Sequence, residues 1–396
     1  MKKIVRASLF PFAAGLASLR AVRRLLLALC AVAACGGNSG PPAIALTGCP
    51  EIGYVAPFTI GGQTFQLGVD TGSSTLAVAS SACTDCGSVT PLYTPGATAV
   101  DQHHGVEVVY GDGESWVGEI FVDSVQVGGM GSAARMPLAA VVSQDGGFFG
   151  SFPCTSGQPS VAPQGLAGFG PSGLAAPGTQ SVASELPAFG FGDSFAVELC
   201  AQNGKLWLGD YDPSAATAPP FYAPMVPSKF YAVGLLDLQV GGQSLGFGAG
   251  TFDAGIVDTG TTALLVPPAV YGPLTQAIAA APAFQASFGT AAWFSASQCS
   301  APLAQPAPSA SDFDQQLPSL TFVVATDGGA ADLTLSPTES YLLPYSDQGT
   351  TYYCPSLAEA PLGATTVLGV AAMRAHLVIF DLAHGRLGFA PQSQCD

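Results

Sequence analysis

The pattern that decides the fold occurs twice in this chain. Phe65-Gln-Leu-Gly-Val-Asp-Thr-Gly-Ser-Ser74 returns as Ala254-Gly-Ile-Val-Asp-Thr-Gly-Thr-Thr262. In both stretches an apolar segment typical of a buried strand ends in Asp-Thr-Gly, and hydroxyl side chains follow it. Because self-similar segments indicate repeated structural units, the sequence predicts two related lobes, which we place at residues 49–218 and 219–396.

Two further pairs of segments support the duplication. Val125-Gln-Val-Gly-Gly129 returns as Leu238-Gln-Val-Gly-Gly242, and Gly165-Leu-Ala-Gly168 returns more loosely as Thr366-Val-Leu-Gly369. The same elements therefore follow one another in the same order, and at similar spacing, in each half of the chain.

The composition favours strands over helices. The 396 residues include 49 Gly and 32 Pro, which break helices and separate short strands. We predict a hairpin with a Gly-Gly turn over 59–65, strands over 106–110 and 120–127, a helix over 268–280 and a loop over 301–310. The predicted fold class is all-β.

The charge of the chain excludes one class of partner. The formal net charge is −16, six of the 11 Lys and Arg residues lie in the first 24 positions, and no acidic residue precedes Glu51. Phosphate binding needs clustered Lys and Arg, so nucleic acid is not an expected partner. A chain with so few bases gains little positive charge in acid, which is consistent with function at low pH and equally with ordinary acidic solubility.

The two Asp-Thr-Gly turns predict acid catalysis. If the lobes pack symmetrically, Asp70 and Asp258 meet at the interface, and the glycines at 72 and 260 let backbone N–H groups approach the carboxylates. Two carboxylates about 3 Å apart cannot both ionise, so they share one proton. The ionised partner can activate a water while the protonated partner polarises a peptide carbonyl, which predicts amide hydrolysis without a covalent intermediate.

These motifs resemble those of the pepsin-like (family A1) aspartic peptidases, in a bacterial-type exported form, and the resemblance runs from about Tyr54 to Ala390. Besides the two active-site motifs, four segments carry it: Tyr110-Gly-Asp-Gly113 resembles the flap, Gly165-Leu-Ala-Gly-Phe-Gly170 and Val367-Leu-Gly369 resemble the paired hydrophobic-glycine segments, and Arg374 with 378–390 resembles the carboxyl end. The resemblance implies a bilobal fold of two pseudo-symmetric, barrel-like lobes with a cleft between them.

The resemblance also implies a role for each matching position. Asp70 and Asp258 would form the catalytic dyad, supported by Thr71, Gly72, Ser73, Thr259, Gly260 and Thr261. The threonines at 71 and 259 would cross-brace the turns, and Ser73 and Thr261 would bond the outer carboxylate oxygens. Tyr110, Gly111 and Asp112 would form the flap over the substrate.

One departure from the family concerns the flap. The family commonly has a tryptophan bonded to the flap tyrosine, and Ala77 stands at that position. Substrates would be extended polypeptides with large apolar residues beside the cut. Phe149, Phe152 and Phe169 are candidates for lining the cleft, although core packing is the more usual role for such residues.

The amino terminus is typical of an export signal. Basic residues up to Arg24 precede ten apolar residues over 25–34, too few to span a membrane, so we predict a signal peptide over 1–34. Val32-Ala-Ala-Cys35 resembles a lipoprotein cleavage box, which predicts lipidation of Cys35 and a tether over 35–48. The product would be an outer-membrane or cell-surface lipoprotein, or a secreted protein if cleavage leaves no lipid.

The remaining cysteines predict disulfides, because an even set in an exported chain is typical of them. They are Cys49, Cys83, Cys86, Cys154, Cys200, Cys299, Cys354 and Cys395. The family resemblance implies the pairs 83–86 and 299–354, which leaves 154–200 and 49–395 for the other four. A single Cys-X-X-Cys does not complete a zinc site, so no metal and no cofactor are expected.

Two alternatives to a peptidase remain open from the sequence. Some proteins with this fold bind other proteins without cutting them, and a surface lipoprotein could use the same cleft only to bind peptides. Both active-site motifs are intact here, which favours the enzyme. The protein is expected to be a monomer that contacts a membrane only through a lipid anchor.

Overall fold

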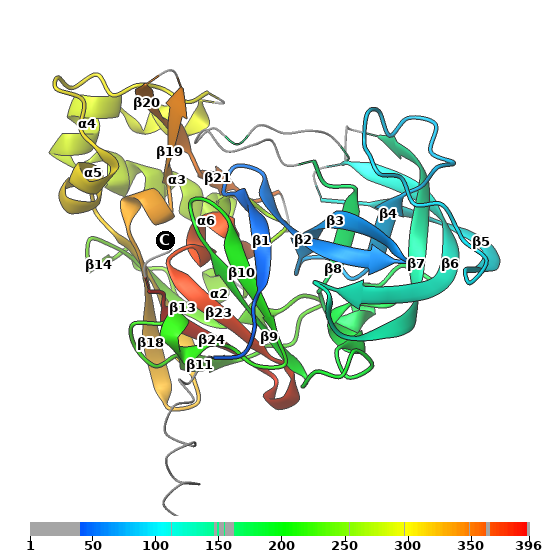
Figure 1. The fold of residues 1–396 in the computed structure, drawn as a ribbon. Helices are drawn as coiled ribbons and strands as arrows, with labels where there is room; N and C mark the ends of the chain where they lie inside the picture. The colour runs from blue at the N-terminus through cyan, green and yellow to red at the C-terminus, as the bar shows by residue number, and fades with distance from the viewer. Residues whose placement is uncertain are drawn as a thin grey trace, which may run out of the picture. The chain divides into compact units, whose positions relative to one another are not determined.

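The fold is built from short strands that the glycine-rich turns separate, as the composition predicts. The computed structural model describes residues 40–393 except 112, 146–148, 150–153, 155–161, 253, 297, 348 and 362–364. Residues 43–396 form one unit of the chain (Figure 1). The segment 1–34 predicted to be a signal peptide, and the predicted lipidation site Cys35, lie outside the described residues.

The strands of the first half are β1 (Ile44–Cys49), β2 (Gly53–Ile60), β3 (Gln63–Asp70), β4 (Leu76–Ala79), β5 (Val100–Val109), β6 (Ser115–Val127), β7 (Met130–Asp145), β8 (Gly165–Gly168), β9 (Ser194–Leu199) and β10 (Gly204–Leu208). Those of the second half are β11 (Phe221–Pro224), β12 (Ala232–Val233), β13 (Leu235–Val240), β14 (Gln243–Ser244), β15 (Gly255–Val257), β16 (Leu264–Val266), β17 (Leu320–Thr326), β18 (Gly329–Leu335), β19 (Leu342–Asp347), β20 (Thr350–Pro355), β21 (Leu357–Glu359), β22 (Thr366–Leu368), β23 (His376–Asp381) and β24 (Arg386–Pro391).

The helices lie mainly in the second half. The α-helices are α2 (Ala249–Phe252), α3 (Pro268–Ala279), α4 (Pro282–Phe288), α5 (Ala310–Gln316) and α6 (Val370–Met373), and the short 3-10 helices are η1 (Ser172–Leu174), η2 (Ala183–Glu185), η3 (Pro213–Ala215), η4 (Ala291–Ser295), η5 (Pro337–Glu339) and η6 (Leu382–His384). Several α-helices and 3-10 helices begin at prolines, which are favourable in the first helical turn because their missing N–H has no partner there.

The predicted elements are found within a few residues of their expected bounds. Gly61 and Gly62 form the turn between β2 and β3 with φ of +57° and +81°, a conformation that glycine adopts without strain. Strand β6 contains the strand predicted at 120–127, β5 covers all of the strand predicted at 106–110 except Tyr110, and α3 matches the predicted helix. The all-β fold class is confirmed.

The duplication is visible in how the strands pair. In the first half β2, β3, β8, β4 and β7 lie in that order, and in the second half β12, β15, β22, β16 and β21 repeat it. In each set the strand that leads to Asp-Thr-Gly pairs in parallel with the hydrophobic-glycine strand, β3 with β8 and β15 with β22. The repeat in the sequence is therefore a repeat of strand topology.

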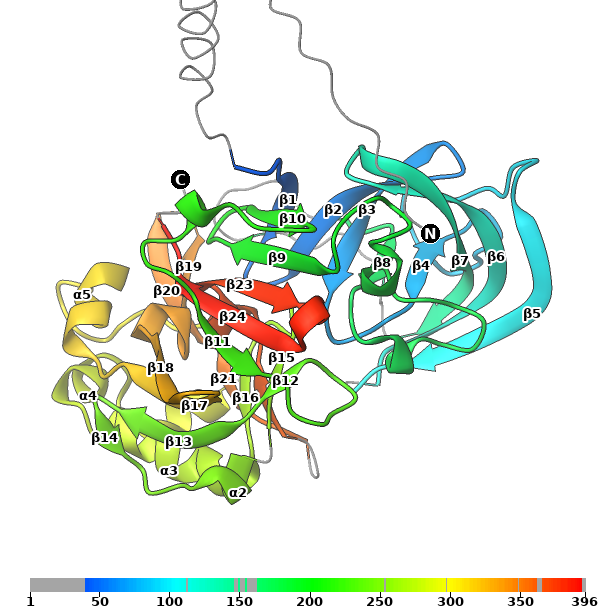
Figure 2. The same cartoon turned by 90° about the horizontal axis from the view of Figure 1, so that it is seen from below.

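A sheet made from both halves connects the two lobes. In the order β11-β24-β23-β9-β10-β1, three strands of the second half are followed by three strands of the first, and they meet where β9 pairs antiparallel with β23 (Figures 1 and 2). Its first strand, β1, begins at Ile44 and pairs with β10. The predicted tether over 35–48 therefore extends too far, because residues from Ile44 onward belong to the sheet.

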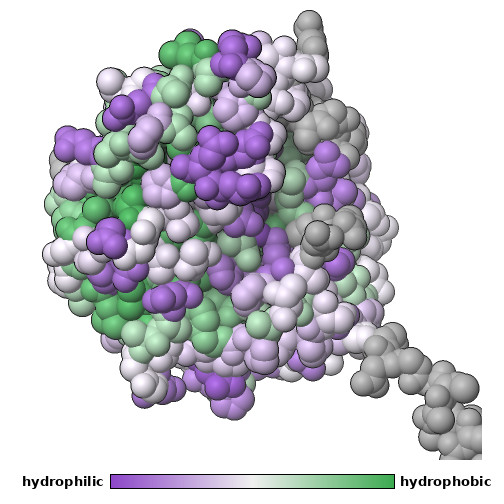
Figure 3. Space-filling view, turned by 90° about the vertical axis from the view of Figure 1, so that its left-hand side faces the viewer, coloured by the Kyte–Doolittle hydropathy of each residue, from purple (hydrophilic) through white to green (hydrophobic). Residues whose placement is uncertain are grey.

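The hydrophobic core continues beneath this shared sheet. Phe195 of β9 stacks on Phe380 of β23 with ring centroids 4.4 Å apart, and Phe169 lies 5.2 Å from Phe195. These side chains are buried, so their packing removes aromatic surface of both halves from water. On the outer face drawn in Figure 3, hydrophilic and hydrophobic residues lie interspersed.

The disulfides agree with two expected pairs and correct the others. Cys83 bonds Cys86 and Cys299 bonds Cys354. Cys49, however, bonds Cys154 and not Cys395, so Cys154 is not the partner of Cys200. Cys200 is also disulfide-bonded, and Cys395 lies outside the described residues.

Candidate active site

The two sequence motifs meet at one place in the fold. Asp70 is the last residue of β3, and Asp258 directly follows β15. Gly168 and Gly369 close the neighbouring strands, and a Cβ atom at either glycine would lie within 3.0 Å of the backbone of the adjacent Asp-Thr-Gly loop. Glycine is required at both positions because the backbone of each loop packs directly against the backbone of the paired strand and leaves no room for a side chain.

Each carboxylate is held by the same pair of donors. The N–H of Gly72 donates to Asp70 Oδ1 and the N–H of Gly260 donates to Asp258 Oδ1, both at 2.8 Å. The outer oxygen of Asp70 accepts from the Ser73 hydroxyl, and that of Asp258 accepts from Thr261 Oγ1 at 2.6 Å. The two carboxylates therefore occupy equivalent hydrogen-bond frames.

The glycines of the motifs also bring the carboxylates towards each other. A Cβ at Gly72 would lie 2.5 Å from Oδ1 of Asp258, and a Cβ at Gly260 would lie within 3.0 Å of Oδ1 of Asp70 and 3.2 Å from Oδ1 of Asp258. Each glycine thus faces the carboxylate of the other motif. Any larger side chain would have to displace an aspartate, so the absence of a Cβ is a steric requirement of the pair.

The threonines of the two motifs brace the loops against each other. The N–H of Thr71 donates to Thr259 Oγ1, and the N–H of Thr259 donates to Thr71 Oγ1, both at 3.0 Å. Thr71 Oγ1 in turn donates to the carbonyl of Val257, and Thr259 Oγ1 to that of Val69. Because both threonines are buried, this reciprocal network fixes the spacing of the two loops.

The electrostatics of the pair favour a retained proton. Burial, the charge of Asp258 and a hydrogen bond with Asp258 raise the pKa of Asp70 above its usual range. Hydrogen bonds from Ser73 and Gly72 act in the opposite direction, since they stabilise the charged form. The net shift is upward, so one carboxyl can remain protonated where an isolated aspartate would be ionised.

A hairpin lies near this pair, because its residue Glu114 lines the same cavity as Asp70. Strands β5 and β6 enclose Tyr110 and Gly111, and the N–H of Tyr110 donates to the carbonyl of Glu114 at 2.9 Å. The Nε1–H of Trp116 donates to the Tyr110 hydroxyl at 3.0 Å. Asp112 lies outside the described residues.

Trp116 provides the indole hydrogen bond to Tyr110 that the alanine at position 77 cannot provide. Trp116 is only 1% exposed, and it packs in one buried cluster with Ala77, Ala139 and Ile120. The tyrosine is therefore bonded by an indole from its own hairpin, next to the small side chain at 77. The signal in the sequence was Trp116 itself, six residues after the tyrosine, but the bond depends on how the hairpin folds back on itself.

A cavity of about 280 Å³ opens beside Asp70. Its lining includes Tyr54, Phe149 and Leu166, together with Thr259 and Gly260 of the second motif. Of the three phenylalanines suggested by the sequence, Phe149 lines this cavity, Phe169 lies in the core and Phe152 is outside the described residues. The sequence did not single out Tyr54 or Leu166, because no motif marks them.

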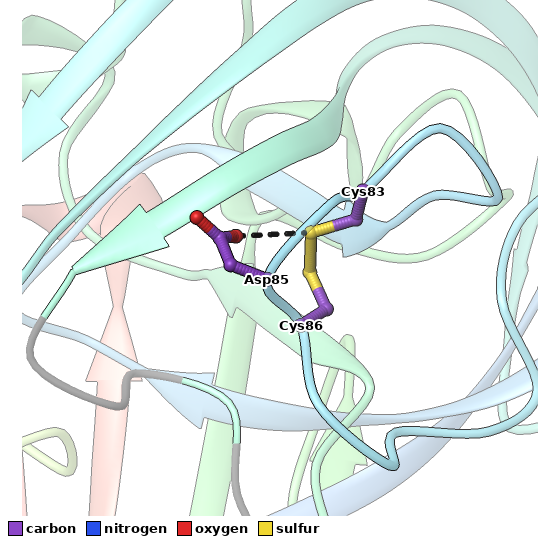
Figure 4. A group of neighbouring side chains, drawn as sticks. All are labelled: Cys83, Asp85 and Cys86. Carbon is purple, nitrogen blue, oxygen red and sulfur yellow. Dashed lines mark hydrogen bonds between the residues drawn. A yellow bond between two sulfur atoms is a disulfide. The ribbon is translucent and has the colours of Figure 1, made fainter.

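One cluster has the residue types of a metal site. Cys83, Asp85 and Cys86 place their ligand atoms within 4.8 Å of one another. Both sulfurs belong to a disulfide, and Asp85 Oδ1 lies 3.5 Å from the sulfur of Cys83 (Figure 4). A metal-binding cysteine must be a thiolate, so this cluster does not offer thiolate ligands. Asp85 instead accepts from Ser143 Oγ and the N–H of Gln144.

Comparisons with known proteins agree with this geometry. A family model described as eukaryotic aspartyl protease matches residues 53–392. A beta-secretase of Strongylocentrotus purpuratus is 29% identical over 393 residues, covering 88% of this chain and 68% of that protein. An aspartic protease of Phaffia rhodozyma is 31% identical over an alignment that covers 57% of this chain and 52% of that protein. Gastricsin of Cavia porcellus is 29% identical over 83% of this chain and 77% of gastricsin. The chain therefore belongs to the eukaryotic aspartyl protease family and is an aspartic-type endopeptidase.

Proposed function

We propose that Asp70 and Asp258 are the catalytic pair of an endopeptidase that works at acidic pH. The observation that carries this proposal is the equivalent hydrogen-bonding of the two carboxylates, each facing the glycine of the opposite motif. The raised pKa of Asp70 supports it, since a pair that shares one proton needs one protonated member.

The chemistry of the pair is a general acid–base hydrolysis. The ionised carboxylate takes a proton from a water molecule while the water oxygen forms a bond to the peptide carbonyl carbon. The protonated carboxyl gives its proton to the carbonyl oxygen. Collapse of the resulting diol breaks the C–N bond: the proton taken from the water passes to the leaving nitrogen, and one diol hydroxyl returns its proton to the second carboxylate, which restores the starting pair. Ser73 and Thr261 hold the outer oxygens, so the inner oxygens face the reacting groups.

The test is cleavage of an acid-denatured protein by the purified chain. Asp70→Asn and Asp258→Asn should each reduce kcat by about 10³-fold, within the range that general acid–base catalysis contributes. Asp327→Asn, at an exposed turn between β17 and β18, is the matched control and should cleave normally. Cleavage that survives both active-site substitutions would refute the pair, and a folded wild-type chain without any cleavage would favour a binding or inhibitor protein instead.

The substrate is proposed to be a polypeptide in an extended conformation, with large apolar residues around the cut. Tyr110, Gly111 and Asp112 would cover it as the flap, and the apolar side chains beside Asp70 would receive its side chains. The family acts on polypeptides, which supports the substrate class. A cleavage-site profile on denatured proteins that lacks apolar residues beside the cut would contradict this preference.

The protein is further proposed to be exported as a monomer, after removal of 1–34, and anchored by lipid on Cys35, or secreted without it. The relatives named above are eukaryotic, so they do not support a bacterial-type form. Among the described residues, no helix has both the length and the apolarity needed to cross a membrane. Mass spectrometry of the N-terminal peptide tests the anchor: an unmodified residue 35, or a chain that retains the first 34 residues, would exclude it, and sedimentation tests the monomer.

A further inference from the structure

A glycine stands beside the candidate catalytic pair where a strand would ordinarily carry a side chain. Gly68 precedes Asp70 by two residues in β3, and residues two apart in a strand share one face. Both Gly68 and Asp70 line the cavity of about 280 Å³. Position 68 therefore faces the space next to the reacting carboxyl.

No turn or backbone approach requires a glycine there. The φ of Gly68 is not in the positive region, and a Cβ atom at this position would be 3.1 Å from Leu166 Cδ1 and 3.8 Å from the carbonyl oxygen of Gly165, with no other atom within 4 Å. By contrast, a Cβ at Gly165, on the neighbouring strand, would overlap backbone atoms within 3.0 Å. A side chain at 68 would thus meet only the end of a flexible leucine and would extend into the cavity.

The size of the cavity is suited to a large side chain. Its volume is about 280 Å³, well above the roughly 150 Å³ of an apolar protein cavity that holds benzene. Its walls are mainly apolar and include Phe149, Pro163 and Leu166. Three acidic residues also line it: Asp70 itself, and Glu51 and Glu114 from two other segments.

We propose that Gly68 is the specificity-determining residue that opens this cavity to a large aromatic side chain of the substrate, such as tryptophan or phenylalanine, close to the scissile bond. The inference rests on the proposed function, because only a bound substrate would place a side chain there. An uncharged aromatic group matches the apolar walls, whereas a lysine or arginine would have to be desolvated against them.

The test uses Gly68→Val and a set of peptides. The peptides differ in one residue, tryptophan, phenylalanine, alanine or lysine, scanned over the three positions on each side of the cut. For the wild-type chain kcat/KM should be highest with an aromatic residue at one position. In Gly68→Val that preference should fall by about 10- to 100-fold, the range expected for a few methylene groups in an apolar pocket, while the alanine peptide should change little.

Two further variants separate pocket size from folding. Gly68→Val combined with Leu166→Ala vacates space next to the new side chain and should recover most of the aromatic preference. Gly96→Val, at an exposed glycine with no atom within 4 Å of its Cβ position, is the matched control and should keep the wild-type profile. Thermal unfolding of each variant shows whether it folds.

The outcomes distinguish this inference from the proposed function. If the wild-type chain cleaves the peptides and Gly68→Val leaves the aromatic preference unchanged, the inference is wrong and the catalytic pair stands. A wild-type preference for lysine at every position would also overturn it. If no peptide is cleaved by the folded wild-type chain, the proposed function itself fails. If Gly68→Val does not fold, Gly68→Ala decides by the same comparison.

Discussion

At the scale of single residues, the raised pKa of Asp70 affects the stability of the fold. Burial is its largest cause and the charge of Asp258 comes next, so the folded state keeps a proton that the unfolded chain releases. Native proteins are only marginally stable, and a charge pair forced together is a cost that the rest of the fold must offset. The site is therefore expected to be less stable at neutral pH than in acid.

The corresponding prediction concerns Asp70→Asn. A carboxyl with a raised folded pKa lowers stability progressively as the pH rises from the ordinary aspartate value towards the raised one. Removing the charge should therefore stabilise the variant relative to wild type at pH 7, by about 1.4 kcal/mol for each pH unit that separates the folded pKa from the ordinary one, and this gain should vanish near pH 3. Unfolding free energies at both values check this.

The pH dependence is the informative part of that measurement. Loss of the hydrogen bonds from Ser73 and Gly72 changes stability by a similar amount at both pH values, so it does not mimic the expected trend. A difference between variant and wild type that stays constant from pH 3 to pH 7 would mean that Asp70 titrates normally.

At the scale of elements, the flap hairpin carries its own anchor. Tyr110 follows β5, Trp116 lies in β6, and the bond between them joins the tip of the hairpin to a side chain buried beneath it. Because Trp116 packs against Ala77 and Ala139, which belong to β4 and β7, the hairpin tip is coupled to the body of the lobe.

Trp116→Phe should loosen the flap while keeping most of the packing. A lost hydrogen bond of this kind corresponds to about 0.5–1.5 kcal/mol, so kcat/KM should fall by roughly 2- to 13-fold, mainly through KM, since this hairpin is proposed to cover bound substrate. Tyr110→Phe should have a similar effect, and the double variant should be no worse than either single one, because both remove the same bond. Steady-state kinetics on one peptide provide the comparison.

Trp207→Phe is the matched control for the loss of an indole. Trp207 is also buried, but it lies in β10 in a cluster with Ala196 and Leu377, away from the hairpin. It should lower stability without changing KM. Additive effects of Trp116→Phe and Tyr110→Phe would contradict a shared role for the two side chains.

At the scale of the whole molecule, His376 is expected to lower the stability of the fold at the acidic pH at which the protein is proposed to work. This side chain begins β23 in the sheet that joins the lobes, is 6% exposed, and its Nδ1 has no hydrogen-bond partner among the described residues. Burial lowers the pKa of His376 to about 4. The folded protein keeps it neutral where the unfolded chain takes up a proton.

The shared sheet should therefore weaken as the pH falls. Between pH 6.5 and 4 the unfolded state binds the proton and the folded state does not, so the wild type should lose about 3 kcal/mol of stability from this residue over that window. His376→Asn should remove that slope whatever its effect at pH 7. Denaturant unfolding between pH 6.5 and 4 measures this pH dependence of stability, and His103→Asn, at an exposed histidine, is the control. Identical slopes in wild type and His376→Asn would show that His376 does not contribute.

The local patterns of the sequence determined the fold class, the duplication and both Asp-Thr-Gly turns, because strand periodicity, glycine turns and short motifs are encoded within a few residues. The family resemblance carried by those motifs implied supporting roles for Thr71, Ser73, Thr259 and Thr261, and the structure shows the corresponding hydrogen bonds. Only the tertiary structure decided that Cys49 pairs with Cys154, that Trp116 supports the flap tyrosine, and that Gly68 leaves a cavity. Those contacts arise when distant strands pack side by side, and no local pattern specifies which side chains then meet.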